Sequence, residues 1–461
     1  MKLNRYYTGT LCCAVVSFFL FACSGDKKED TSAADGAFSV PVEYYKLNNG
    51  LKVVLSQDKS TPTVTVAVYY NIGFRIEPRN RTGFAHLFEH MMFQGSANLG
   101  KMEFVKLVQQ NGGILNGSTR FDFTNYFEVM PAHKLETALW AEADRMKGLD
   151  ITQDNLTNQQ GVVKNEVKVN VLNQPYGGFP WLDMPQFANE NWNNAHNFYG
   201  DLADLDSAKL EDVDSFFKTY YAPNNAALVV VGDFEIADAK KWVTQYFDSI
   251  PAATLPQKPD LSEPEQKQEK RKVKEDKLAN KPALAVAYKM PERGTPEYYA
   301  MGLIDQLLVQ GEDSKLNEKL VQGKGYTANV TGGINYLGNM FNYNGPMIWM
   351  ADLIYDQQVP ADSIIKQFDE AVAELSNVSQ ADVDLAIIKF RSSFYDMIAD
   401  NGIGRADLLA VFALFDDDPS RINGLENEFR KITPEVIRKT ASSFLRPENR
   451  SILIVDPKAP Q

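Results

Sequence analysis

The feature that most constrains the fold is a nine-residue pattern that occurs twice. Residues 223–231 read PNNAALVVV and residues 447–455 read PENRSILIV. In each copy a turn that begins with proline leads into an apolar, β-branched run, which is typical of a buried strand. A helical pattern precedes each copy, opening at Leu210 and at Ile432. A repeat with a period near half of the chain predicts two domains of one fold.

The remaining sequence divides around this repeat. Alternating and β-branched strand patterns begin near Val40, and helical patterns lie between them. We predict a first α/β domain over residues 40–255 and a second over 271–461, so the fold class is α+β with two homologous α/β domains. Residues 256–270 are rich in Pro, Gln, Lys and Glu, which predicts a linker. Residues 174–206 are predicted to form a long loop.

The amino terminus has the pattern of an export signal. Residues 1–22 combine a short positive head with an apolar run too short to span a membrane, which predicts a signal peptide. The run ends in LFAC at Cys23, which resembles a bacterial lipobox and implies a lipid on Cys23 and an outer-membrane lipoprotein. Residues 23–39 would then be a lipidated tether. A plain secretory signal with an incidental cysteine is the alternative.

The net charge and the cysteine content argue against a nucleic-acid-binding protein and against a disulfide-stabilised fold. The net charge of −13 argues against nucleic-acid binding through a basic surface. The three cysteines, at positions 12, 13 and 23, leave only Cys23 after cleavage, so an internal disulfide is not expected. Contact with a membrane is predicted only through the lipid on Cys23.

A second short pattern carries chemistry: His86-Leu87-Phe88-Glu89-His90. On a helix, His86 and His90 project from one face and can hold one Zn²⁺, while Glu89 lies close enough to take a proton from water. The order His-x-x-Glu-His is the inverted form of a common zinc-protease pattern. The alternative is a surface helix that carries two histidines. His133 and His196 have no partner at ligand spacing and are predicted to be structural or exposed.

The residues on either side of this pattern resemble those of a known family. Residues 83–95, GFAHLFEHMMFQG, resemble the signature of the pitrilysin-type M16 metallopeptidases. The resemblance implies two domains that enclose a cleft, a zinc site in the first, and a peptide substrate. It also implies that Glu166, which follows His90 after seventy-five intervening residues, completes a site for one Zn²⁺ per chain. Glu89 would deprotonate a water at the fourth position and later pass the proton to the leaving amine.

Two further segments take expectations from the same resemblance. Asn116, Gly117 and Ser118 stand where the family has a strand edge that pairs with the substrate backbone, with Gly in place of Ala. A glycine-rich turn before a strand explains the same residues equally well. Many relatives carry a second glutamate at the position of Gln159, whose amide is expected to hydrogen-bond a ligand without adding charge.

The second half departs from the family. Single-chain relatives supply an arginine and a tyrosine there, which bind substrate and stabilise the oxyanion, but the matching positions are Val321 and Ala328. Tyr326, predicted on a strand, would share a face with Ala328 and could substitute. The resemblance therefore implies the zinc subunit of a heterodimer whose partner carries the pair. A non-catalytic scaffold, a self-sufficient homo-oligomeric peptidase and a metal-transport lipoprotein remain alternatives.

Overall fold

The computed structural model describes residues 39–399 and 402–457, and residues from Val40 onward form one compact unit. The predicted signal peptide, the lipid site at Cys23 and nearly all of the predicted tether lie outside the described residues. Within the described part of the chain, no helix is both long and apolar enough to cross a membrane.

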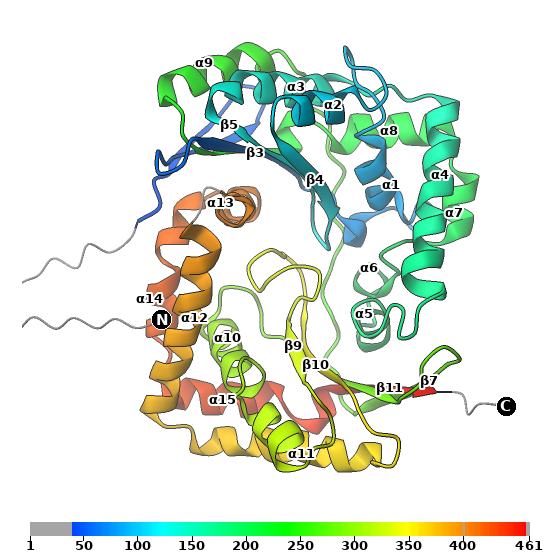
Figure 1. The fold of residues 1–461 in the computed structure, drawn as a ribbon, viewed down its shortest axis with the longest axis vertical. Helices are drawn as coiled ribbons and strands as arrows, with labels where there is room; N and C mark the ends of the chain where they lie inside the picture. The colour runs from blue at the N-terminus through cyan, green and yellow to red at the C-terminus, as the bar shows by residue number, and fades with distance from the viewer. Residues whose placement is uncertain (1–38, 400–401, 458–461) are drawn as a thin grey trace, which may run out of the picture. The chain divides into compact units, whose positions relative to one another are not determined.

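Two separate β-sheets organise the unit (Figure 1). The first has the strand order β1-β2-β6-β3-β5-β4 and the second the order β7-β11-β8-β10-β9. The strands of the first sheet are β1 (Glu43–Lys46), β2 (Lys52–Gln57), β3 (Thr63–Tyr70), β4 (Ile114–Thr119), β5 (Thr124–Pro131) and β6 (Ala226–Gly232). Those of the second are β7 (Lys270–Asp276), β8 (Ala283–Lys289), β9 (Thr331–Ile334), β10 (Ile348–Ile354) and β11 (Arg450–Pro457).

The two sheets share one topology. In each, the last strand pairs in parallel with an early strand, β6 with β2 and β11 with β7. The last strand also pairs antiparallel with the strand that follows this early strand in the chain, β6 with β3 and β11 with β8. The two copies of the repeat form β6 and β11 together with the turns that precede them. The prediction of two domains of one α/β fold is confirmed, whereas the boundaries at residues 255 and 271 stay predictions.

Fifteen α-helices are found in the described residues. The first half carries α1 (Phe84–Met91), α2 (Glu103–Gln110), α3 (Leu135–Lys147), α4 (Gln153–Val167), α5 (Asp183–Ala188), α6 (Trp192–Ala195), α7 (Leu202–Ser207), α8 (Leu210–Tyr220) and α9 (Ile236–Phe247). The second half carries α10 (Pro296–Leu308), α11 (Ala361–Glu374), α12 (Gln380–Ala399), α13 (Ile403–Asp416), α14 (Leu425–Arg430) and α15 (Pro434–Phe444).

Each half contributes a helix to the sheet of the other half. Helix α13 packs on β2, β3 and β6 of the first sheet (Figure 1), and α5 packs on β8 and β11 of the second. All seven residues of β6 are buried, so both of its faces are covered, one of them by α13. Burial on both faces favours a continuous apolar run over an alternating one. The segment predicted as a long loop, 174–206, in fact contains α5, α6 and the start of α7, so that prediction was wrong.

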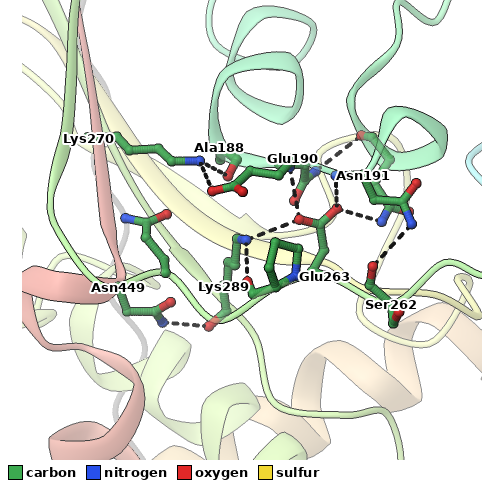
Figure 2. Close-up of polar contacts among 12 residues, drawn as sticks. Ala188, Glu190, Asn191, Ser262, Glu263, Lys270, Lys289 and Asn449 are labelled. Carbon is green, nitrogen blue, oxygen red and sulfur yellow. Dashed lines mark hydrogen bonds and ion pairs between the residues drawn. The ribbon is translucent and has the colours of Figure 1, made fainter.

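The predicted linker has no helix or strand before β7, yet it is held firmly by Glu263 (Figure 2). The Glu263 carboxylate accepts hydrogen bonds from the backbone N–H groups of Glu190 and Asn191 and from the side chain of Asn194, at 2.7–3.1 Å. Lys289 Nζ, from β8, lies 3.1 Å from the same carboxylate. One buried side chain of the linker thus joins the α5–α6 segment to the second sheet.

Candidate metal centre

Helix α1 positions the two histidines of the His-x-x-Glu-His pattern. Its apolar residues Phe84, Leu87, Phe88 and Met91 are buried in the core of the first half, which fixes the rotation of the helix. His86 and His90 project from the same face, and their Nε2 atoms lie 3.4 Å apart. The helix predicted over this segment is therefore present, and it brings both imidazoles to one point.

A buried carboxylate holds the first turn of this helix in place. Glu77 accepts hydrogen bonds from the backbone N–H of Gly83, at 2.8 Å, and of Ala85, at 2.5 Å. These N–H groups have no partner within the helix, and a negative charge at a helix N-terminus is stabilising. His196 Nε2 lies 3.5 Å from the same carboxylate, and its ring stacks on Trp192. His196 therefore has a structural place, as expected, while His133 is exposed.

Glu166 reaches the histidines from helix α4, which packs against α1. Its Oε2 atom lies 3.3 Å from Nε2 of His90 and 3.6 Å from Nε2 of His86. Tetrahedral ligands at zinc bond lengths of about 2.0–2.1 Å stand about 3.3–3.4 Å apart. The triangle formed by His86, His90 and Glu166 therefore fits one Zn²⁺, and it is the one cluster of this kind among the described residues.

The charge states of these side chains suit a cation. Burial lowers the pKa of His86 to about 4, and the neighbouring His90 adds to this effect, so the imidazole is neutral at neutral pH. The hydrogen bond with His90 holds the pKa of Glu166 below its usual range, so its carboxylate is ionised. Neutral imidazoles and an ionised carboxylate are the forms in which these groups bind metal.

Glu89 lies next to this triangle without belonging to it. Thr119, the last residue of β4, donates a hydrogen bond from Oγ1 to Oε2 of Glu89 over 2.8 Å. Burial raises the pKa of Glu89, and the bond from Thr119 opposes that rise. A carboxyl group with a raised pKa beside a metal triangle is suited to receive and return a proton.

Strand β4 forms one edge of the first sheet and pairs only with β5 among the described strands. The glycine-rich turn at residues 112–113 precedes it, so Asn116, Gly117 and Ser118 lie in the strand and not in the turn. A Cβ atom on Gly117 would stand 3.3 Å from Cγ of Glu89 and 3.2 Å from the Tyr126 ring. Glycine therefore leaves room where the strand passes the metal triangle.

Sequence reasoning missed Tyr199, whose hydroxyl donates to Oε1 of Glu166 over 3.3 Å. Its ring also packs edge-on against His86. The amide of Gln159 donates to Asn158 over 2.8 Å, and its expected hydrogen bond to a metal ligand stays a prediction. Tyr199 lies in the aromatic segment predicted as a loop, and its aromatic content was the only available signal.

The second half places no arginine or tyrosine at the two positions named above. Val321 belongs to a π-helical segment, η5 (Asn317–Gly323), and Ala328 follows it in an irregular stretch. Tyr326 was predicted on a strand, but it lies in this stretch before β9, so the face-sharing argument was wrong. Its backbone carbonyl accepts a hydrogen bond from the N–H of Asp356.

Known proteins resemble this chain over nearly its whole length. It is 25% identical over 433 residues to a zinc protease, PqqE, of Helicobacter pylori, which covers 90% of this chain and 93% of that protein. The crystal structure of a protease from Helicobacter pylori superimposes with a TM-score of 0.83, at 23% identity, over 91% of this chain and all of that one. A peptidase M16 inactive domain from Pseudomonas fluorescens has a TM-score of 0.80 at 19% identity, over 92% of this chain and 99% of that one.

Two family models match consecutive parts of the sequence. The model described as insulinase (peptidase family M16) matches residues 52–194, which include all three residues of the metal triangle and Glu89. The model described as the peptidase M16 inactive domain matches residues 207–390. With the metal triangle in the first match and the repeated fold spanning both, this chain belongs to the M16 peptidase family.

Proposed function

We propose that this chain is a zinc-dependent endopeptidase that hydrolyses extended peptides. The observation that carries the proposal is the triangle of His86, His90 and Glu166, with ligand atoms 3.3–3.6 Å apart and Glu89 beside it. A structural zinc site would use a fourth protein ligand, and the described residues offer none within this cluster. Three ligands and an adjacent carboxyl group are the composition of a hydrolytic site.

The mechanism divides between the metal and the protein. When bound, Zn²⁺ supplies Lewis-acid chemistry that activates water and polarises the scissile carbonyl. Glu89 accepts the proton of the attacking water and later delivers it to the leaving amine. Thr119 holds one oxygen of Glu89, which orients the carboxylate for both transfers. Tyr199 and Glu77 act through other groups: Tyr199 orients Glu166, and Glu77 fixes the first turn of α1.

The substrate class follows from the free edge of β4. An extended peptide that adds to this edge forms main-chain hydrogen bonds, which place little demand on its sequence. The strand ends at Thr119, whose side chain contacts Glu89, so a peptide aligned along residues 114–119 passes the metal triangle. We propose that Asn116, Gly117 and Ser118 are the binding residues along this edge.

A partner subunit is the second part of the proposal. The second half has valine and alanine where an arginine and a tyrosine are expected, and it matches the inactive-domain model. Losing one oxyanion donor typically lowers turnover by about a hundred- to a thousand-fold. We therefore propose that a homologous chain supplies these donors. A scaffold subunit without activity is the competing function, because the metal triangle alone does not require turnover.

We further propose an outer-membrane lipoprotein anchored through Cys23, on the basis of the LFAC sequence alone. Replacement of Cys23 by alanine should release the protein from membranes into the soluble fraction. A protein that stays with the membrane fraction after this change would be anchored in some other way.

The direct test is a library of fluorogenic peptides incubated with the zinc-loaded protein alone, with the metal-free protein as the blank. Cleavage above the blank by the chain alone establishes a peptidase and removes the need for a partner. Zinc binding without cleavage, followed by cleavage after addition of a homologous chain, supports the heterodimer. Zinc binding with no cleavage in either case supports the scaffold.

A further inference from the structure

Arg120 is the first residue after β4 and begins the four-residue connection to β5. Its backbone is held on both sides, because its N–H donates to Phe123 O over 2.8 Å and its carbonyl accepts from the N–H of Phe74 at 3.2 Å. The position of its Cα atom is therefore fixed relative to the edge strand. This rigidity matters because Thr119, one residue earlier, holds Glu89.

The other three side chains of this connection already have partners. Phe121 packs on Phe74 with ring centroids 4.6 Å apart, and Phe123 packs on Tyr69 at 5.0 Å. Asp122 forms a buried ion pair with Arg75 at 3.2 Å. These contacts account for the packing of the connection without any contribution from Arg120.

The guanidinium of Arg120 differs from its neighbours. Arg120 is half-buried, yet its guanidinium makes no hydrogen bond or ion pair with any residue that the structure describes. An arginine carries five N–H donors in a planar fork, and removing such a group from water without a partner is costly. A fixed, half-buried arginine with free donors is prepared to bind an anion.

Two carboxyl groups lie within electrostatic range of the Arg120 guanidinium: Glu89, beside the metal triangle, and Asp407 on α13. Thr119, the residue before Arg120, contacts the first of them, and Tyr69 contacts the second. The charge of Arg120 therefore acts on the region between the metal triangle and α13.

Neither carboxyl group uses the donors of Arg120. Glu89 receives its hydrogen bond from Thr119, and Asp407 receives one from Tyr69 at 2.9 Å and two longer ones from Asn339 and Asn342. The metal ligand Glu166 adds a further negative charge nearby. An anionic substrate group would be repelled here without a cation, and Arg120 provides one at the end of the strand on which a peptide would lie.

We propose that Arg120 binds a carboxylate of the substrate: an acidic side chain close to the scissile bond, or the C-terminal carboxylate of a peptide aligned on β4. The planar fork of arginine matches a carboxylate with two parallel N–H···O bonds. This assignment rests on the proposed function, because it requires a peptide substrate along the edge strand. It gives the site a preference for acidic peptides that the edge strand alone does not confer.

The test measures binding separately from cleavage. Labelled decapeptides are titrated against the zinc-loaded Glu89→Gln protein and followed by fluorescence anisotropy. One set moves a single Glu through a neutral sequence with an amidated C-terminus, a matched set replaces that Glu by Gln or Lys, and a third carries a free C-terminal carboxylate. The first and third sets distinguish the two sources of the carboxylate.

We expect at least one carboxylate peptide to bind about tenfold more tightly than its neutral counterpart, as for a charge-assisted hydrogen bond. Arg120→Gln should abolish this difference, and Arg120→Glu should favour the Lys peptides. Arg430→Gln removes the same charge from α14 and should leave the preference intact. The melting temperature of each variant verifies folding.

The inference is overturned by equal affinity for all peptides, by a preference that survives in Arg120→Gln, or by no peptide binding. The proposed function fails in a different way. If the peptides bind with an Arg120-dependent preference but the wild-type protein cleaves none of them, alone or with a homologous chain, the binding role stands and the peptidase does not. If Arg120→Gln slows cleavage of every peptide equally, Arg120 acts on the reaction and not on selection.

Discussion

Thr119 Oγ1 and Glu89 Oε2 are 2.8 Å apart, and this hydrogen bond joins the free edge strand β4 to the metal-binding helix α1. The residue proposed to move protons is thus fixed by the strand proposed to hold the substrate. A peptide paired with β4 would be positioned relative to Glu89 through the hydrogen bond between Thr119 and Glu89. Substrate position and base orientation are therefore coupled through Thr119.

Replacing Thr119 by valine should lower turnover while zinc stays bound. Valine keeps the shape but cannot donate, and hydrogen bonds to charged groups contribute about 1.5–3 kcal/mol, so we expect a loss of about ten- to a hundredfold in kcat. The hydrogen bond lowers the pKa of Glu89, so its removal should shift the acid limb of the pH–rate profile upward. Thr119→Ser should behave as wild type, whereas loss of zinc from the valine variant would show that Thr119 supports the metal instead.

Tyr199→Phe should weaken zinc binding. The hydroxyl of Tyr199 donates to Oε1 of Glu166, and removing such a partner of a metal ligand typically costs about 10- to 100-fold in metal affinity. Competition with a chelator of known affinity measures the change. Tyr246→Phe removes a hydroxyl that contacts Glu136 on the surface and serves as the control. Equal zinc affinity in both variants would mean that Glu166 needs no support from Tyr199.

Removal of the metal should lower the melting temperature of the protein, and this effect should require His90 as a ligand. A ligand that binds only the folded state stabilises it by RT ln(1 + [L]/Kd), so added zinc should raise the melting temperature of the metal-free protein. His90→Ala removes one of the three ligands and should largely abolish this rise. His133→Ala changes an exposed histidine and should retain it. A rise of the same size in His90→Ala would place the zinc elsewhere.

The buried carboxyl group of Glu128, on β5, should lower the free energy of unfolding as the pH rises. Burial raises the pKa of Glu128 well above its usual range, and the carboxylate of Glu142 raises it further. The folded protein therefore holds a proton that the unfolded chain loses above about pH 4.3. Between these two pKa values, each pH unit removes up to about 1.4 kcal/mol of stability.

The matched variant is Glu128→Gln, which resembles the protonated acid and cannot ionise. Its free energy of unfolding, measured with urea at pH 6, 7.5 and 9, should exceed that of wild type by an amount that grows with pH. Glu136→Gln, at an exposed position of α3, should follow the wild-type pH dependence. Parallel curves for wild type and Glu128→Gln would mean that Glu128 is ionised in the folded protein.

The repeat and the His-x-x-Glu-His pattern predicted most of the framework because both depend on local signals. The two copies of PxN followed by an apolar run became β6 and β11, and the helix at His86 is where its periodicity placed it. Glu166 could be placed only through family spacing, since the three ligands come from two helices that meet in the tertiary structure.

The misses have a common physical cause. Tyr199 and Thr119 contact residues 33 and 30 positions away in the sequence, and Glu77 caps a helix from six residues before Gly83. No periodicity marks such contacts. Short helices such as α5 are too brief to show a period, so segment 174–206 resembled a loop.

The role of Glu89 as general base is tested on one sample of the Glu89→Gln protein, in which zinc content and peptide turnover are measured together. Glutamine keeps the shape of Glu89 but cannot accept the proton, and general-base catalysis contributes about 10²–10⁴-fold. We expect one zinc per chain and turnover at least about a hundredfold below that of the wild type measured under the same conditions and with the same partner. Full turnover with zinc bound, or loss of zinc from this variant, would contradict that role.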